Sequence, residues 1–118
     1  MEIFISYAWG AAVSGKRPLQ EKTLGVVASV RKALPAARVW VDIEKLAAES
    51  CNRGMADAMV AAIDRANLVI VCISLEYQES KNCMAEYTYA TGESKAIVYV
   101  KYGLALPRGV RVLCHAVL

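Results

Sequence analysis

The sequence has few of the residues from which metal centres and redox motifs are built. Its 118 residues include one histidine, His115, and four cysteines with no C-x-x-C spacing. Zinc sites combine several such ligands at close spacing, so we expect no metal site and no bound cofactor. Cys72 and Cys114 lie inside apolar runs, as buried free thiols do. Reduced thiols are typical of the cytoplasm, where we expect the protein to be located.

Charge of one sign and long apolar runs are also scarce. The 14 basic and 11 acidic residues give a formal charge of +3 and are scattered along the chain, which indicates a solvated surface and no nucleic-acid partner. No apolar stretch approaches the ~20 residues of a membrane helix. The first apolar run begins two residues after Met1, which leaves no room for a signal peptide.

The sequence does contain many short apolar runs, because 57% of its residues are hydrophobic. A chain of this length forms one domain, which we assign to residues 1–118. Runs rich in Val, Ile and aromatic residues predict strands at 2–6, 38–41, 68–74, 96–100 and 110–117. Most are continuously apolar, as strands covered on both faces are.

Helical patterns fill the first three gaps between these strands. In the first gap the apolar stripe is formed by Leu24, Val27, Val30 and Leu34, and Pro35 ends it. In the second gap, the stripe after Gly54 consists of Met55, Met59, Ile63 and Ala66. The third gap holds a helix over residues 80–91, with Ser80 as its cap. Strand–helix alternation predicts a doubly wound α/β fold with a parallel sheet.

The chain ends in its fifth apolar run, and no closing helix follows to cover that face of the sheet. Two interpretations remain open. Either the chain is a fragment of a larger multidomain protein, or a partner supplies the cover.

Ligands of an open parallel sheet bind beyond the carboxyl ends of its strands. Reading those ends predicts one rim that holds Ser6, Tyr7, Trp9, Asp42 and Ser74. No P-loop or dinucleotide fingerprint stands there. The acidic residues of a response-regulator receiver are missing, and so is the G-x-S-x-G elbow of a serine hydrolase.

Glu86 is the most unusual residue of the third helical segment. It lies three residues after Cys83, so helical geometry sets a carboxylate beside the stripe that faces the core. The same helix starts just beyond the third strand, and Glu86 is therefore able to point into the rim. The alternatives are that Glu86 caps a network near the helix start or pairs with Lys81 or Arg53 at the surface.

Three segments resemble the sequence boxes of a TIR domain (Toll/interleukin-1 receptor type), in that family's order and spacing. They are "IFISYAWG", "VWVDIEKLAAESCNRG" and "AIDRANLVIVCISLEYQESKNCMAE". The resemblance implies a flavodoxin-like, three-layer fold with a five-stranded parallel sheet in the order 2-1-3-4-5. The family's final helix would be the piece missing after Leu118.

The resemblance also implies two kinds of function. Many TIR domains are signalling scaffolds, among them proteins of innate immunity, that assemble with other TIR domains. Residues 42–54 would form the family's interaction loop, which in this sequence contains Asp42, Glu44, Lys45, Leu46, Asn52, Arg53 and Gly54. On this interpretation the partners are other TIR domains, and activation produces a homo-oligomer.

Other TIR domains cleave NAD+ to nicotinamide and an ADP-ribose product, which is sometimes cyclised. In these enzymes an essential glutamate follows a cysteine by three residues, and Cys83 and Glu86 match that placement. The resemblance implies that Glu86 is catalytic and that the substrate-binding residues are Ser6, Tyr7, Trp9, Asp42, Ser74 and Cys83. Many of the enzymes carry a tryptophan four residues before the glutamate, where this chain has Asn82; Trp9 is the candidate to replace it.

Overall fold

The computed structural model describes residues 1–9, 13–41 and 54–102, and for residues 54–56 it describes the backbone alone. Within these ranges the chain forms a parallel sheet of four strands in the order β2-β1-β3-β4. The strands are β1 (Glu2–Ser6), β2 (Arg38–Val41), β3 (Leu68–Ile73) and β4 (Ala96–Lys101). The helices are α1 (Pro18–Ala33), α3 (Gly54–Arg65), α4 (Leu75–Glu79) and α5 (Lys81–Gly92).

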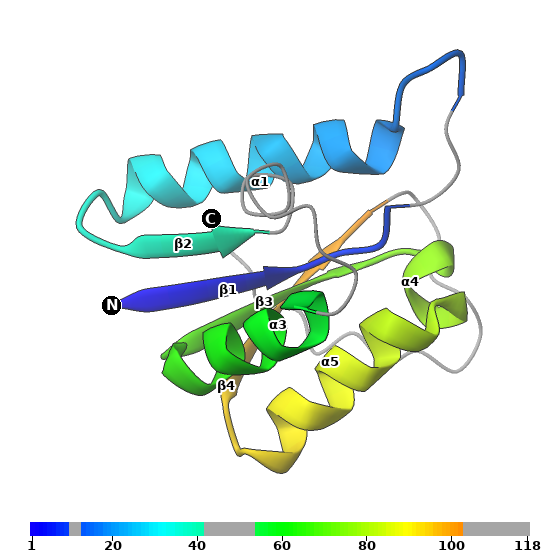
Figure 1. Cartoon of the computed structure of the whole chain (residues 1–118). Helices are drawn as coiled ribbons and strands as arrows, with labels where there is room; N and C mark the ends of the chain where they lie inside the picture. Colours follow the sequence, from blue (N-terminus) through cyan, green and yellow to red (C-terminus); the bar gives the residue numbers. More distant parts are fainter. Residues whose placement is uncertain (10–12, 42–53, 103–118) are drawn as a thin grey trace.

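The described elements form three layers, with α1 on one face of the sheet and α3, α4 and α5 on the other (Figure 1). A hydrophobic core lies on each face of the sheet. Alternate residues of β1 pack into one core or the other, because successive side chains of a strand point to opposite faces. Ile3 and Ile5 pack toward α1 with Val27 and Val30. Phe4 packs toward α3 and α5, where its ring stacks on Trp40 at a centroid distance of 4.9 Å.

The expected α/β class and parallel sheet are confirmed, and so is the order of the first four strands. The strands pair in parallel register, with Ile5 of β1 opposite Val41 on one side and Ile70 on the other. The strand predicted at 110–117 and the question of a closing helix lie outside the described residues. None of the helices in the described ranges combines the length and apolar character needed to cross a bilayer.

The face that α1 buries differs in part from the predicted stripe. Val27 and Val30 are buried as expected, but Leu24 and Leu34 are 43% and 38% exposed. Thr23 takes the core position instead and is fully buried. Its hydroxyl donates to the Leu19 carbonyl at 2.8 Å and lies 2.7 Å from the Tyr102 hydroxyl. A buried threonine is tolerated there because its polar atom is hydrogen-bonded.

The segment after β3 contains two helices where the sequence predicted one. Ser74 caps α4 by accepting the backbone N–H of Tyr77 at 3.0 Å. Ser80 then caps α5 by accepting the N–H of Cys83 at 3.2 Å, which confirms its predicted role. This pair of caps turns the chain sharply and brings the first turn of α5 to the carboxyl end of β1.

Candidate functional site

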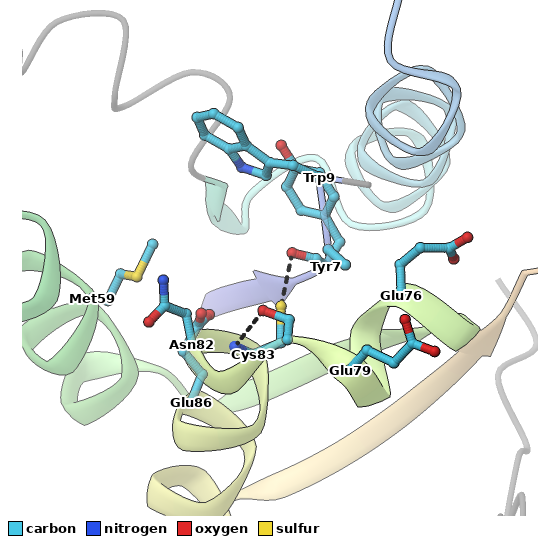
Figure 2. A pocket seen from close by; sticks show the side chains of 10 residues that line it. Tyr7, Trp9, Met59, Glu76, Glu79, Asn82, Cys83 and Glu86 are labelled. Carbon is cyan, nitrogen blue, oxygen red and sulfur yellow. Dashed lines mark hydrogen bonds between the residues drawn. The ribbon is translucent and has the colours of Figure 1, made fainter. Parts of the chain in front are cut away.

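A cleft of about 450 Å³ opens at the carboxyl end of β1, where a parallel sheet is expected to bind ligands. The segment after β1 forms one wall, and α3 contributes Met59. The opposite wall comes from α4 and α5 (Figure 2). The side chains that those two helices place in the wall include Glu76, Glu79, Asn82, Cys83 and Glu86.

The half-buried carboxylate of Glu86 is hydrogen-bonded to the sheet by a residue that lies outside the lining of the cleft. The hydroxyl of Ser6, the last residue of β1, donates a hydrogen bond to Glu86 Oε1 at 3.2 Å. Ser6 is only 2% exposed, and it does not line the cleft. The strand end and the helix are thus joined through the carboxylate itself, which orients Glu86 relative to the sheet.

Cys83, one turn before Glu86, connects α5 to the segment directly after β1. Its thiol donates to the Tyr7 carbonyl at 3.4 Å (Figure 2), and its side chain is 4% exposed. A cysteine three residues before the glutamate lies on the same helix face, so the two side chains approach β1 together. Cys83 therefore fixes the helix that carries Glu86.

Trp9 forms the upper wall of the cleft in Figure 2 and is 40% exposed. The guanidinium carbon of Arg17 lies 5.3 Å from the centroid of its ring, within cation–π range. Asn82, which lies one helical turn before Glu86 on α5, lines the same cleft. The aromatic surface of this site therefore comes from the loop after β1 and not from α5.

Tyr77 is a member of this region that the sequence analysis missed as a functional candidate. It is 2% exposed, and its hydroxyl lies 2.8 Å from Ser6 Oγ. Burial raises the pKa of Tyr77 well above its usual range, and the negative charge of Glu86 adds to that effect. One feature of the sequence could have indicated its position. Tyr77 stands three residues after Ser74, and a serine cap at that spacing places the third residue of the helix close to the end of the preceding strand.

Glu76 and Glu79 were also missed. Both are exposed on α4 and both line the cleft. The helix that carries them was not predicted, so nothing in the sequence pattern placed these carboxylates near Glu86. They make the α4 side of the cleft acidic.

The predicted site residues divide into three groups. Tyr7, Trp9, Cys83 and Glu86 come together in the lining of the cleft. Ser6 contacts Glu86 from behind, and Ser74 is 5% exposed and caps α4 without lining the cleft. Of the seven residues named for the expected interaction loop, six lie outside the described residues, namely Asp42, Glu44, Lys45, Leu46, Asn52 and Arg53. The seventh, Gly54, begins α3.

In the described ranges, no group of three or more His, Cys, Asp or Glu side chains is arranged to hold a metal ion. The two cysteines described there, Cys72 and Cys83, are free thiols and both are buried.

Comparison with known proteins agrees with the fold. The model of the TIR domain family matches residues 3–113. Among solved structures, the chain is similar to the TIR domain of the Toll-related receptor TRR-2 from Hydra magnipapillata, with a TM-score of 0.60 and 20% sequence identity. That alignment covers 90% of this chain and 74% of the Hydra chain. No curated protein matches the sequence.

Proposed function

The chain belongs to the TIR domain family, and from this premise we propose that it hydrolyses NAD+ to nicotinamide and an ADP-ribose-type product, with Glu86 as the catalytic residue. The observation that carries the proposal is the hydrogen bond of 3.2 Å from Ser6 to Glu86. It holds a half-buried carboxylate in the lining of a cleft at the carboxyl end of the sheet.

The chemistry of the leaving group explains why one carboxylate suffices. Ordinary glycoside hydrolysis needs a carboxylic acid to protonate the departing oxygen, together with a second carboxylate. In NAD+ the bond between C1′ of the ribose and the pyridinium nitrogen breaks with its electron pair moving to that nitrogen. Nicotinamide then leaves neutral, and no acid is required.

What the site must stabilise is the positive charge that develops on the ribose as this bond breaks. The fixed carboxylate of Glu86 supplies the opposite charge in a partly sheltered cleft, where it is more effective than in water. It also serves to orient a ribose hydroxyl by accepting its hydrogen bond. Water adds to C1′ and releases one proton to the solvent, which completes the hydrolysis.

Two neighbouring side chains fit the rest of the substrate. Trp9 lines the cleft, is 40% exposed, and supplies a ring for a base to stack on. Asn82 lies one helical turn before Glu86 and supplies amide groups that hydrogen-bond to a carboxamide or a sugar hydroxyl. We include Tyr7 and Cys83 with them, as residues that shape the floor, and Asp42 as a residue of the same pocket.

The test is nicotinamide release from NAD+ by the purified domain, measured in dilute solution and concentrated on a support. Wild type should release nicotinamide, and Glu86→Ala should abolish the release while keeping the wild-type circular dichroism spectrum and a cooperative thermal unfolding transition. No release by wild type at high local concentration would contradict the proposal.

We also propose that the domain self-associates and acts in signalling through other TIR domains. A shallow, open groove on the outer face of α5, lined by Lys81, Met84, Ala85, Thr88 and Tyr89, supports this. Met84 is 38% exposed there, and Leu75 on neighbouring α4 is 54% exposed, as interface residues often are. The loop at 42–54 is the second surface that we propose for these contacts.

The two arms of the nicotinamide assay also test self-association. If assembly completes the cleft, the rate per molecule should be higher on the support than in dilute solution, and Met84→Asp should reduce that difference. Equal rates per molecule in both arms, with a monomeric mass by light scattering at all concentrations, would argue for a self-sufficient monomer.

A further inference from the structure

We propose that Tyr77 and Ser6 are positioning residues, linked in a hydrogen-bond chain that sets the orientation of the Glu86 carboxylate. The inference rests on the proposed hydrolysis and adds two residues to it. This hydrogen-bond chain connects three elements, because Tyr77 belongs to α4, Ser6 to β1 and Glu86 to α5.

The direction of the chain follows from counting hydrogens. A serine hydroxyl has one hydrogen to donate, and Ser6 gives it to Glu86 Oε1 at 3.2 Å. The contact of 2.8 Å between the Ser6 and Tyr77 oxygens must then be donated by Tyr77. Tyr77 thus holds the Ser6 hydroxyl in the rotamer that points its hydrogen at the carboxylate.

The protonation state of Tyr77 suits this task. Because burial raises the pKa of Tyr77 far above its usual range, its hydroxyl keeps its proton at any working pH and remains a donor. Both Tyr77 and Ser6 are 2% exposed, and hydrogen bonds shielded from water are stronger and reinforce one another along a chain.

Neither residue is placed to touch a substrate. The lining of the cleft includes Glu86 but not Ser6 or Tyr77, so both act through the carboxylate. Fixing Oε1 against β1 also fixes the direction in which the other oxygen faces. A glutamate side chain has several rotatable bonds, and holding it in one arrangement before the substrate arrives lowers the cost of reaching the transition state.

The experiment compares Tyr77→Phe with wild type in steady-state nicotinamide release. Phenylalanine keeps the buried ring and removes only the donor, so kcat should fall about tenfold with KM nearly unchanged. Tyr99→Phe is the matched control, because it removes a hydroxyl–hydroxyl bond of the same 2.8 Å length, to Tyr87, away from the cleft. Its kcat should equal that of wild type.

A double-mutant cycle separates positioning from general packing. Ser6→Ala should lower kcat by at least as much as Tyr77→Phe, and the double variant should be no slower than Ser6→Ala alone, because the tyrosine acts only through the serine. If the double variant instead lost kcat by the product of the two single-variant factors, the proposed hydrogen-bond chain would be wrong. If Tyr77→Phe does not fold, Ser6→Ala alone decides, and a wild-type kcat in that variant overturns the inference.

The same assay distinguishes failure of this inference from failure of the proposed function. If wild type releases nicotinamide, Glu86→Ala does not, and Tyr77→Phe matches wild type, the positioning chain is wrong and the hydrolysis stands. If wild type and Glu86→Ala are equally inactive, the hydrolysis is wrong and the positioning role falls with it.

Discussion

At the scale of single residues, the cleft sets one sheltered carboxylate beside two exposed ones. Glu86 is half-buried and bonded to Ser6, whereas Glu76 and Glu79 stand on α4 in contact with solvent. A sheltered carboxylate interacts strongly with charge that develops close to it, while exposed carboxylates are screened by water and salt. We therefore assign chemistry to the first and an electrostatic influence on binding to the other two.

This difference predicts how the exposed carboxylates affect substrate affinity. NAD+ carries an anionic diphosphate, so Glu76→Gln and Glu79→Gln should each lower KM by about two- to fivefold at low ionic strength, the range expected for exposed charge pairs. The effect should shrink at high salt because the charges are screened.

Glu21→Gln, on α1, is the matched control for a lost exposed carboxylate away from the cleft. Its KM should equal that of wild type. A rise in KM for either α4 variant would show that these carboxylates bind the substrate and do not repel it.

At the scale of elements, α5 is held in place at both ends. Ser80 caps its start, Glu86 accepts a hydrogen bond from the last residue of β1, and Cys83 donates one to the residue that follows. Near its other end, the Tyr89 hydroxyl donates to Asp64 of α3 at 2.5 Å, and this hydrogen bond raises the pKa of Tyr89 to about 12. The helix that carries the proposed catalytic residue is thus fixed between the sheet and α3.

The cap at Ser80 is the most accessible of these contacts to a stability measurement. Ser80→Ala removes the acceptor for the Cys83 N–H and should lower the free energy of unfolding by about 1 kcal/mol in urea titrations. Ser80→Asp keeps an acceptor and should stay near wild type. Equal stability of the alanine variant and wild type would mean that the cap contributes nothing.

The start of α5 was predictable from the sequence, whereas α4 and the buried face of α1 were not. Serine before an apolar helical pattern is a local signal, so Ser80 was identified as a cap. The separate helix α4 was not, because its five residues are too few for a periodic pattern. The core position of Thr23 was missed for a related reason, since its partner Tyr102 is 79 residues away in the chain.

At the scale of the whole molecule, the cores on both faces of the sheet contain groups that are buried in their protonated form. Burial raises the pKa of the Cys72 thiol from 9.0 to about 12. Burial also raises the pKa values of Tyr77 and Tyr102 above their usual range. The unfolded chain ionises these groups at lower pH than the folded one, so the folded state binds more protons at alkaline pH.

The free energy of unfolding should therefore fall as pH rises through the alkaline range. For Cys72 the contribution to stability is fully present below pH 9 and is lost as pH rises toward 12, by up to about 1.4 kcal/mol per pH unit. Urea unfolding at several pH values should show this decline, and Cys72→Ala should reduce its slope. An unchanged slope in that variant would mean that Cys72 does not titrate as its burial implies.

The sequence patterns predicted the parallel sheet and the convergence of Tyr7, Trp9 and Glu86 on one rim. The strand order and the place of Cys83 in the site were implied by the family resemblance. Strand ends of a parallel sheet share one edge, so residues that follow them converge without knowledge of side-chain contacts. The positioning roles that we propose for Ser6 and Tyr77 could not be predicted from the sequence, because they depend on hydroxyl directions. Asp42, Arg53 and their loop lie outside the described residues, and their part in the site stays a prediction.

The most direct test of the account compares the rate of nicotinamide release by wild type, Glu86→Gln and Glu93→Gln on the same support. Glutamine keeps the shape of Glu86 and an acceptor for Ser6 but removes the charge, so kcat should fall at least about a hundredfold. Glu93→Gln changes an exposed carboxylate at the far end of α5 and should retain the wild-type rate. A Glu86→Gln variant that releases nicotinamide as fast as wild type would contradict the central claim.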